Sequence, residues 1–267
     1  MKTFKNLILL SSLFIQVFFI GCSNSSDNSS NQTLEASDTN STINSSNEAT
    51  QSTDAVAAQT PETPTEKLPL PDEELLKGWQ RVYVKNTCNL DMPTTLEVQA
   101  GKYREFVVEN NNSKGYEGSQ LTMQQAGLND KLPEAFEKYA RVMIETTFGN
   151  TGDYEKLNFN FGQYSEKDIS DLNEQMKSQT VQGFYGTELK LTEWLSTKLE
   201  KINGMSCIHI SYTRQFQDKP IVMVDTYTFP NNDRVHHLTM SYRVSDADYW
   251  IKDYKEILKS FRITSVK

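Results

Sequence analysis

The chain has 267 residues, with 27 Lys and Arg against 35 Asp and Glu, and its formal net charge is −8. That length allows one sizeable domain or two small ones. An acidic chain has no broad positive field, which excludes nucleic acid as its main partner.

The first residues have the pattern of an export signal. A short basic start with Lys2 and Lys5 precedes a mostly apolar stretch from Asn6 to Ile20, and Gly21 and Cys22 follow. An apolar run of this length is typical of a secretory signal and is shorter than the roughly 20 residues of a transmembrane helix. We therefore expect residues 1–21 to be a signal peptide.

Residues 22–66 are predicted to be a disordered acidic tether. Ser, Asn, Thr and Gln dominate the segment, which contains seven acids and no Lys or Arg. Such a composition buries too little apolar surface to offset the entropy lost when a chain becomes ordered. A coil of this length reaches roughly 35–40 Å, so it would hold a folded domain away from its attachment point.

The rest of the chain, residues 67–267, is predicted to form one globular domain. In its first part we expect strands at 80–87, 95–99, 102–109 and 120–126, with a turn at 89–93. Pro133 is expected to open a helix, because an apolar stripe at helical spacing follows it: Phe136, Tyr139, Ala140, Met143, Ile144 and Thr147. A second helix is expected from Asp168 to about Phe184.

The stretch from Glu188 to Arg243 alternates between apolar and polar residues, which is typical of strands. The predicted strands include 205–216, 221–229 and 234–243, and turn residues such as Asn203-Gly204 separate them. Short connections between long strands predict antiparallel pairing. Ser245 or Asp246 then caps a last amphipathic helix, and an extended tail follows at 262–266.

These elements predict an α+β fold. A helix with a single apolar stripe buries that stripe against a neighbouring layer, here a sheet. We therefore expect a curved antiparallel sheet with helices packed on its faces.

The end of the apolar stretch resembles a known export motif. Phe19-Ile20-Gly21-Cys22 resembles the lipobox of bacterial lipoproteins, with Phe19 where Leu is usual. That resemblance implies acylation (palmitate) of Cys22, cleavage before it, and anchoring to the cell membrane or outer membrane, with the domain in the periplasm or outside the cell. The alternative is an ordinary signal followed by a chance cysteine.

The order of elements is similar to that of the Mog/PsbP-like superfamily. Residues 236–244, followed by Trp250, Ile257 and Phe261, resemble the closing strand and helix of small exported bacterial members. The resemblance implies a curved antiparallel sheet with helices on both sides and no shared catalytic residues.

The histidines and cysteines give no clear chemical site. His236 and His237 are adjacent on a predicted strand and so face opposite ways. Cys207 and His209 share a face, but a second pair of ligands is missing, and we predict no metal and no cofactor. Cys88 and Cys207 have two alternatives, a disulfide bond in the exported compartment or two buried thiols.

No catalytic motif is recognised, and no catalytic residue is predicted. The leading hypothesis is a membrane-anchored envelope lipoprotein whose domain is a non-enzymatic binding or accessory module, with an envelope protein or a glycan as its partner. One rival is an envelope hydrolase that uses an unrecognised carboxylate or Cys/His site. Another is a structural coat protein.

Overall fold

The computed structural model describes residues 75–84, 87–100, 118–155 and 164–264, which all belong to one compact unit. The predicted signal peptide and tether and the strand expected at 102–109 lie outside these ranges. None of the helices in the described ranges is long and apolar enough to cross a membrane.

The described chain is an α+β structure with two antiparallel sheets. Its strands are β1 (Trp79–Val84), β2 (Cys88–Pro93), β3 (Leu96–Val98), β4 (Gly118–Gln125), β5 (Ala140–Phe148), β6 (Leu189–Ile202), β7 (Met205–Phe216), β8 (Val222–Pro230), β9 (Arg234–Arg243) and β10 (Arg262–Ile263). Its helices are the 3₁₀ turns η3 (Pro133–Phe136) and η4 (Val244–Asp246) and the α-helices α2 (Glu166–Gly183) and α3 (Ala247–Ser260). The predicted fold class is confirmed.

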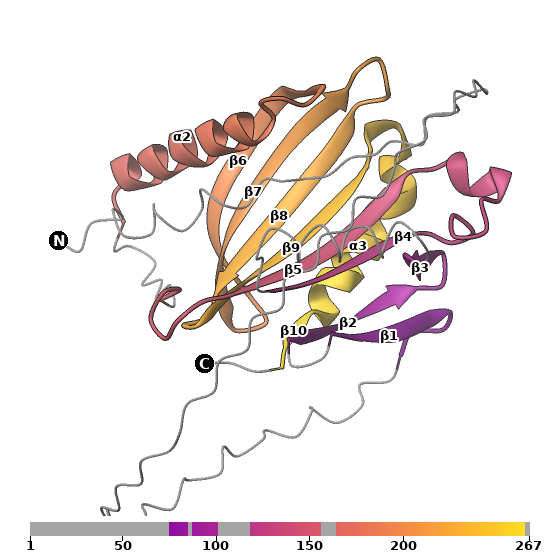
Figure 1. Ribbon diagram of the computed structural model, residues 1–267, viewed down its shortest axis with the longest axis horizontal. Helices are drawn as coiled ribbons and strands as arrows, with labels where there is room; N and C mark the ends of the chain where they lie inside the picture. The colour runs from indigo at the N-terminus through magenta and orange to yellow at the C-terminus, as the bar shows by residue number, and fades with distance from the viewer. Residues whose placement is uncertain (1–74, 85–86, 101–117, 156–163, 265–267) are drawn as a thin grey trace, which may run out of the picture. The chain divides into compact units, whose positions relative to one another are not determined.

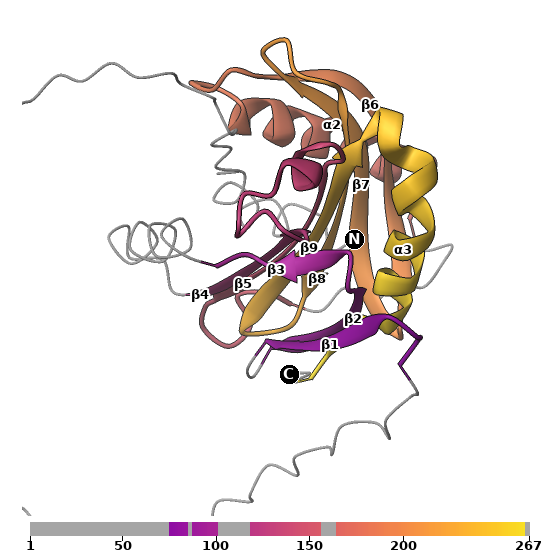
Figure 2. The same cartoon turned by 90° about the vertical axis from the view of Figure 1, so that its right-hand side faces the viewer.

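The small sheet has the order β1-β2-β10, and the large sheet has the order β3-β4-β5-β9-β8-β7-β6. The helices α2 and α3 lie on opposite faces of the large sheet, as the two views in Figure 1 and Figure 2 show. Helix α2 runs beside the edge strand β6, and α3 packs against β2 and β9. The antiparallel run predicted from the alternation is present, with strands at the expected places.

The core lies between the α3 face of the large sheet, helix α3 itself and the small sheet. Fully buried side chains from all three parts meet there, among them Leu90 of β2, Ile144 of β5, Leu238 of β9 and Trp250 of α3. Because β10 follows α3 and pairs with β2, the two ends of the described chain join in the small sheet. The small sheet is therefore part of the same core.

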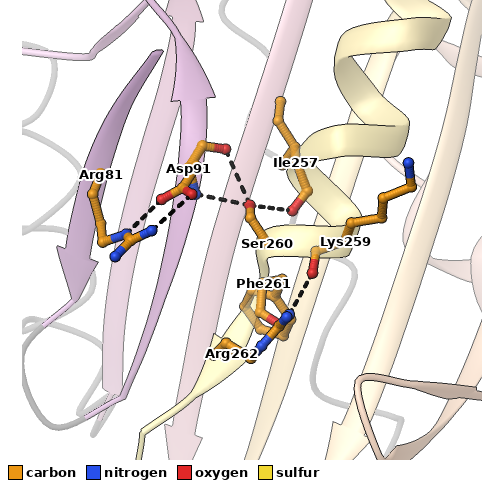
Figure 3. A network of polar contacts seen from close by, with 7 residues as sticks. All are labelled: Arg81, Asp91, Ile257, Lys259, Ser260, Phe261 and Arg262. Carbon is orange, nitrogen blue, oxygen red and sulfur yellow. Dashed lines mark hydrogen bonds and ion pairs between the residues drawn. The ribbon is translucent and has the colours of Figure 1, made fainter. Parts of the chain in front are cut away.

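A polar network joins β2 to the end of α3 (Figure 3). The backbone N–H of Asp91 donates to Oγ of Ser260 at 2.8 Å, and that hydroxyl donates to the carbonyl of Ile257 at 2.8 Å. The Asp91 carboxylate accepts from Nε of Arg81 at 2.7 Å and from Nη2 at 3.0 Å. Strand β1, strand β2 and helix α3 are thus connected in one series of contacts.

The helix predicted to begin at Pro133 is wrong. Only the turn η3 forms there, and residues 140–148 are strand β5. This strand is central, between β4 and β9, and is rich in the β-branched residues Val142, Ile144 and Thr146. In the strand Ala140 and Ile144 lie on one face and Met143 and Thr147 on the other, so residues of opposite faces together imitated a helical stripe.

The turn predicted at 89–93 is also wrong, because these residues belong to β2. Cys88, Leu90 and Met92 face the core, and Asn89 and Asp91 face away from it. The alternation is that of a strand, and the turn-forming polar residues concealed it. The helices predicted near 168–184 and after Asp246 are confirmed as α2 and α3.

Candidate functional site

The face of the large sheet that α2 shares is polar across β4, β5, β9 and β8. We call it the polar face, and the side chains that it comprises are Gln120, Thr122, Gln124, Arg141, Met143, Glu145, Thr147, Val224, Thr226, Thr228, Val235, His237, Thr239 and Ser241. All of them are buried or half-buried. An ordinary solvated sheet face would expose its polar residues, whereas this one is largely polar and only partly open to water.

Cross-strand hydrogen bonds order the centre of the polar face. The hydroxyls of Thr226 and Thr239 lie 3.1 Å apart, and Oγ1 of Thr228 lies 3.0 Å from Nδ1 of His237. His237 stands directly opposite Glu145 in the register of β5 and β9. These hydrogen bonds join β8 to β9, and the register adds Glu145 of β5 to the same row.

Burial changes the protonation of the two titratable groups in this row. It raises the pKa of Glu145 to about 7 and lowers the pKa of His237 to about 4. At neutral pH the imidazole is therefore uncharged and the carboxyl group is close to its midpoint. A carboxyl group in this state can both donate and accept a hydrogen bond.

Two arginines and a tyrosine lie at the end of the polar face. Arg214 of β7 is 3% exposed, and burial lowers its pKa. Burial alone would raise the pKa of Tyr139, but the guanidinium groups of Arg141 and Arg214 outweigh burial and lower it. The guanidinium carbon of Arg141 lies 5.9 Å from the centre of the Tyr139 ring. This end of the polar face thus brings two guanidinium groups close to Tyr139.

A second polar cluster surrounds His209 on the α3 face. Nε2 of His209 lies 2.9 Å from Oδ1 of Asp225 and 3.0 Å from Oγ of Ser211, and Nδ1 lies 3.4 Å from Oε2 of Glu200. The ring stacks on Tyr227 with centroids 4.1 Å apart. The sequence places His209 and Ser211 on one face, but the two carboxylates come from neighbouring strands.

The His209 cluster contains the side chains of a nucleophilic triad but lacks its arrangement. The hydroxyl of Ser211 donates to Asp225, and the same oxygen of Asp225 contacts Nε2. A catalytic base needs a free lone pair directed at the nucleophile, and here the carboxylate takes that place. The carboxylates of Glu200 and Asp225 contact different ring nitrogens, so they do not converge on one point. No group of three or more His, Cys, Asp or Glu side chains is placed to hold a metal within the described ranges.

Cys88 and Cys207 are buried free thiols in the structure, so the disulfide alternative is not formed. Burial raises the pKa of each thiol to about 12, and the nearby carboxylate of Glu200 adds to the effect at Cys207. A thiol with so high a pKa is protonated at neutral pH and is a poor nucleophile. The predicted proximity of Cys207 and His209 therefore makes no Cys/His site.

Two aromatic residues, Trp194 and Phe184, pack between α2 and the large sheet. Trp194 stacks on Tyr212 with centroids 5.8 Å apart, and Phe184 contacts the same ring. Nε1 of Trp194 donates to Oδ1 of Asn173, which fixes α2 on the sheet. Tyr185 is exposed. Cys22, the predicted lipidation site, lies outside the described ranges.

No protein-family model and no curated protein matches the chain. Among solved structures, it is similar to cyanobacterial PsbP (CyanoP) from Synechocystis sp. PCC 6803, with 12% identity, 73% of this chain and 98% of that chain covered, and a TM-score of 0.41. The solved structures that resemble this chain therefore include a PsbP protein, as the resemblance in the sequence predicted.

Two further structures have a similar chain course. LpqN, involved in cell envelope biogenesis of Mycobacterium tuberculosis, matches at 9% identity over 70% of this chain and 92% of that chain, with a TM-score of 0.38. A Bacteroides thetaiotaomicron protein matches at 9% identity over 68% of this chain, which spans only 47% of that protein, also at 0.38. At these values the likenesses assign neither an activity nor a partner to this chain.

Proposed function

We propose that the chain is a lipid-anchored protein of the bacterial cell envelope whose domain is a non-enzymatic binding module, and that the polar face is its binding surface. The lipobox-like sequence before Cys22 and the acidic stretch after it support the anchor and the tether. The observation that carries the binding function is a sheet face that is largely polar and only partly open to water. Polar groups held in fixed positions on rigid strands are suited to orient a ligand.

The anchor is tested by a Cys22→Ser substitution in the native host. We expect the parent chain to be acylated on Cys22, cleaved before it and recovered with membranes, and the variant to be unacylated. Mass spectrometry of the purified N-terminal peptide measures both changes. An uncleaved and unmodified N-terminus in the parent chain would overturn the anchor.

The binding surface is tested with a pair of matched double substitutions. Thr226→Val with Thr239→Val removes a hydroxyl pair from the centre of the polar face and nearly keeps its shape. Thr192→Val with Thr213→Val removes a comparable pair, 2.7 Å apart, between β6 and β7. We expect capture of envelope proteins or glycans from solubilised membranes to fall about tenfold with the first variant only, which is about 1.4 kcal/mol of lost binding. Equal capture by both variants would exclude the polar face.

The His209 cluster supports a second candidate, an envelope hydrolase with Ser211 as nucleophile and His209 as base. The 3.0 Å contact between Ser211 and Nε2 favours it, and the Asp225 contact opposes it. The strand amides around the cluster belong to the ladders of β6, β7 and β8, which leaves them poor donors for an oxyanion. Turnover in a screen of ester, amide and glycoside substrates that disappears in Ser211→Ala and His209→Gln would establish this candidate.

A further inference from the structure

Five large apolar side chains are exposed at the end of the large sheet where β5 and β8 begin and β9 ends. We call them the exposed apolar patch: Leu132, Phe136, Ile221, Val244 and Tyr249, with exposed fractions of 40–48%. They come from η3 and the residue before it, the residue before β8, η4 and the first turn of α3. Patches of this kind on a soluble domain commonly mark an interaction surface.

Hydrogen bonds and a ring contact hold the segments of the exposed apolar patch together. The backbone N–H of Val244 donates to the carbonyl of Ile221 at 3.0 Å. The Arg243 guanidinium donates to the carbonyl of Phe136 at 3.3 Å and to that of Glu137 at 2.8 Å. Nζ of Lys138 lies 5.0 Å from the ring centre of Tyr249. The apolar side chains thus belong to one ordered surface.

The charge around the exposed apolar patch is slightly acidic. Residues 130–138, 217–221 and 243–249 together contain six Asp and Glu and four Lys and Arg. A surface that recognises anionic lipid headgroups has an excess of bases. Contact made by this surface therefore depends on apolar side chains and not on charge.

The predicted tether joins the domain just before β1, in the small sheet. Leu75 and Leu76, the first described residues, are themselves exposed. Backbone hydrogen bonds lead from there toward the patch, from Thr94 N–H to the carbonyl of Gly78, from Ala126 N–H to that of Thr95, and from Leu132 N–H to that of Gly127. The chain that would lead to the lipid at Cys22 thus enters beside the small sheet (Figure 1, Figure 2), and the length of the tether, not its point of entry, allows the patch to reach the bilayer.

We propose that the exposed apolar patch docks the domain onto the bilayer to which the lipid anchors it. This inference rests on the proposed function. A tether of some 40 residues keeps the domain at an effective concentration near the millimolar range at the bilayer surface, so a weak contact suffices. The apolar side chains enter the headgroup boundary, and Tyr249 and Lys138 keep their polar ends at its surface. Docking turns a freely rotating domain into an oriented one.

The test uses the mature chain, residues 22–267, with Cys22→Ser, so that no lipid contributes. Its co-sedimentation with phosphatidylcholine vesicles is compared with that of a variant carrying Leu132→Ser, Phe136→Ser, Ile221→Ser and Val244→Ser. We expect the vesicle partition coefficient to fall about tenfold or more in the variant. A matched control, Tyr83→Ser with Phe148→Ser, replaces exposed apolar residues elsewhere and should keep binding within about twofold.

A second measurement does not depend on a fourfold variant that folds. Tyr249→Trp should give a blue-shifted emission change on vesicle addition, quenched by brominated lipids, and Tyr83→Trp should give neither. Binding should be no stronger with phosphatidylglycerol in the vesicles. An unchanged Tyr249→Trp spectrum, or binding that requires the anionic lipid, would overturn the inference. Concentration-dependent dimerisation without vesicle binding would assign the patch to a second copy instead. Because this chain carries no lipid, a failed anchor in the native host leaves these results intact.

Discussion

His236 and His237 are neighbours in sequence and have opposite surroundings in the fold. His236 is fully buried in the core, where Nδ1 lies 2.9 Å from Oγ1 of Thr146 and Nε2 lies 3.3 Å from Nδ2 of Asn231. The amide of Asn231 donates to Nε2, so the proton of the neutral ring is on Nδ1 and is donated to Thr146. Burial, with a smaller contribution from the charge of Arg234, lowers the pKa of His236 to about 3.

We predict that His236 makes the domain less stable in acid. The unfolded imidazole takes up a proton near pH 6.5 and the folded one only near pH 3, so the unfolded state binds more protons between these values. The stability contribution is complete above pH 6.5 and is lost as the pH falls toward 3. His236→Gln should flatten the dependence of the unfolding free energy on pH between 6 and 4 by about 1.4 kcal/mol per pH unit. Urea unfolding over this range measures it.

Thr146→Val is the control for this prediction. It removes the hydroxyl that contacts Nδ1 and keeps the histidine, so it should lower the unfolding free energy by about 1–2 kcal/mol at neutral pH and keep a steep dependence on pH. If the unfolding free energies of the parent chain and of His236→Gln change in parallel with pH, His236 is not neutral and buried.

Glu145 is predicted to act in the opposite direction. Its folded pKa of about 7 lies above the ordinary value of 4.5, so the folded state binds more protons between these values. The contribution of protonated Glu145 to the unfolding free energy is fully present below pH 4.5 and is lost as the pH rises through 7. Glu145→Gln should therefore stabilise the domain relative to the parent chain at pH 8 and have little effect at pH 4.5.

Thermal unfolding of both chains at the two pH values gives this comparison. Glu193→Gln on the exposed side of β6 is the control and should change the melting temperature equally at both. An effect of Glu145→Gln that is the same at pH 4.5 and pH 8 would mean that the carboxyl group is not withdrawn from water.

If the polar face binds a ligand, a variant that is more stable and binds less would show that the buried carboxyl serves binding at the expense of stability.

Alternation along a strand was sufficient to predict which face the residues of β7, β8 and β9 occupy. It separated His236 from His237 and put Cys207 beside His209, and the structure confirms both. It did not identify Glu200 and Asp225 as neighbours of His209, because cross-strand partners depend on register. In β6 the register shifts twice, between Leu191 and Glu193 and between Trp194 and Ser196. Such bulges leave no reliable signal in a single sequence.

At the scale of elements, the Asn203-Gly204 turn was a better guide than the apolar spacing after Pro133. Asn203-Gly204 predicted the β6–β7 turn correctly, and both residues have positive φ, 50° and 84°. The apolar spacing after Pro133 predicted a helix where β5 lies, because Met143 on the polar face interrupts the alternation of the strand. A two-residue turn is specified by its own residues, whereas β5 is specified by the strands β4 and β9 on either side of it.

Asn203 is predicted to have a second role, which the sequence does not reveal. Its Nδ2 donates to the carbonyl of Leu258 at 3.1 Å and to that of Phe261 at 2.6 Å, at the end of α3. Asn203→Gly keeps a residue that accepts positive φ and removes both bonds, so it should lower the unfolding free energy by about 1–2 kcal/mol. Asn203→Ala should lower it by about 1 kcal/mol more, because alanine also strains the turn. Urea denaturation measures both variants.

The unfolding free energies of the two Asn203 variants, compared with that of the parent chain, test this role. If Asn203→Gly is as stable as the parent chain, the side chain contributes only its backbone conformation. Gly204→Ala tests the turn alone, since it strains the backbone at φ 84° and leaves the bonds to α3 in place. It should destabilise by about 1–2 kcal/mol and should add to the effect of Asn203→Gly.

At the scale of the whole molecule, the two sheets share one core and one set of polar contacts. Strand β2 contributes Cys88, Leu90 and Met92 to that core, and β10, which follows α3, pairs with β2. Ser260 connects the backbone of Asp91 to the last turn of α3 (Figure 3). The small sheet therefore has little reason to unfold separately from the large one.

We predict that the three tryptophans report the same unfolding transition. Trp79 lies in the small sheet, Trp194 lies under α2, and Trp250 is a buried residue of α3 that faces the core. Three variants each keep one tryptophan and replace the other two with Phe. In each variant, the urea transition measured by tryptophan fluorescence should coincide with the transition measured by circular dichroism. Ser260→Ala, which leaves the Asp91 N–H without this acceptor, should lower all three midpoints together by about 1–2 kcal/mol of unfolding free energy. A cooperative core distributes the loss of one contact over the whole domain. If the Trp79 transition precedes the other two and alone responds to Ser260→Ala, the small sheet is therefore a separate unfolding unit.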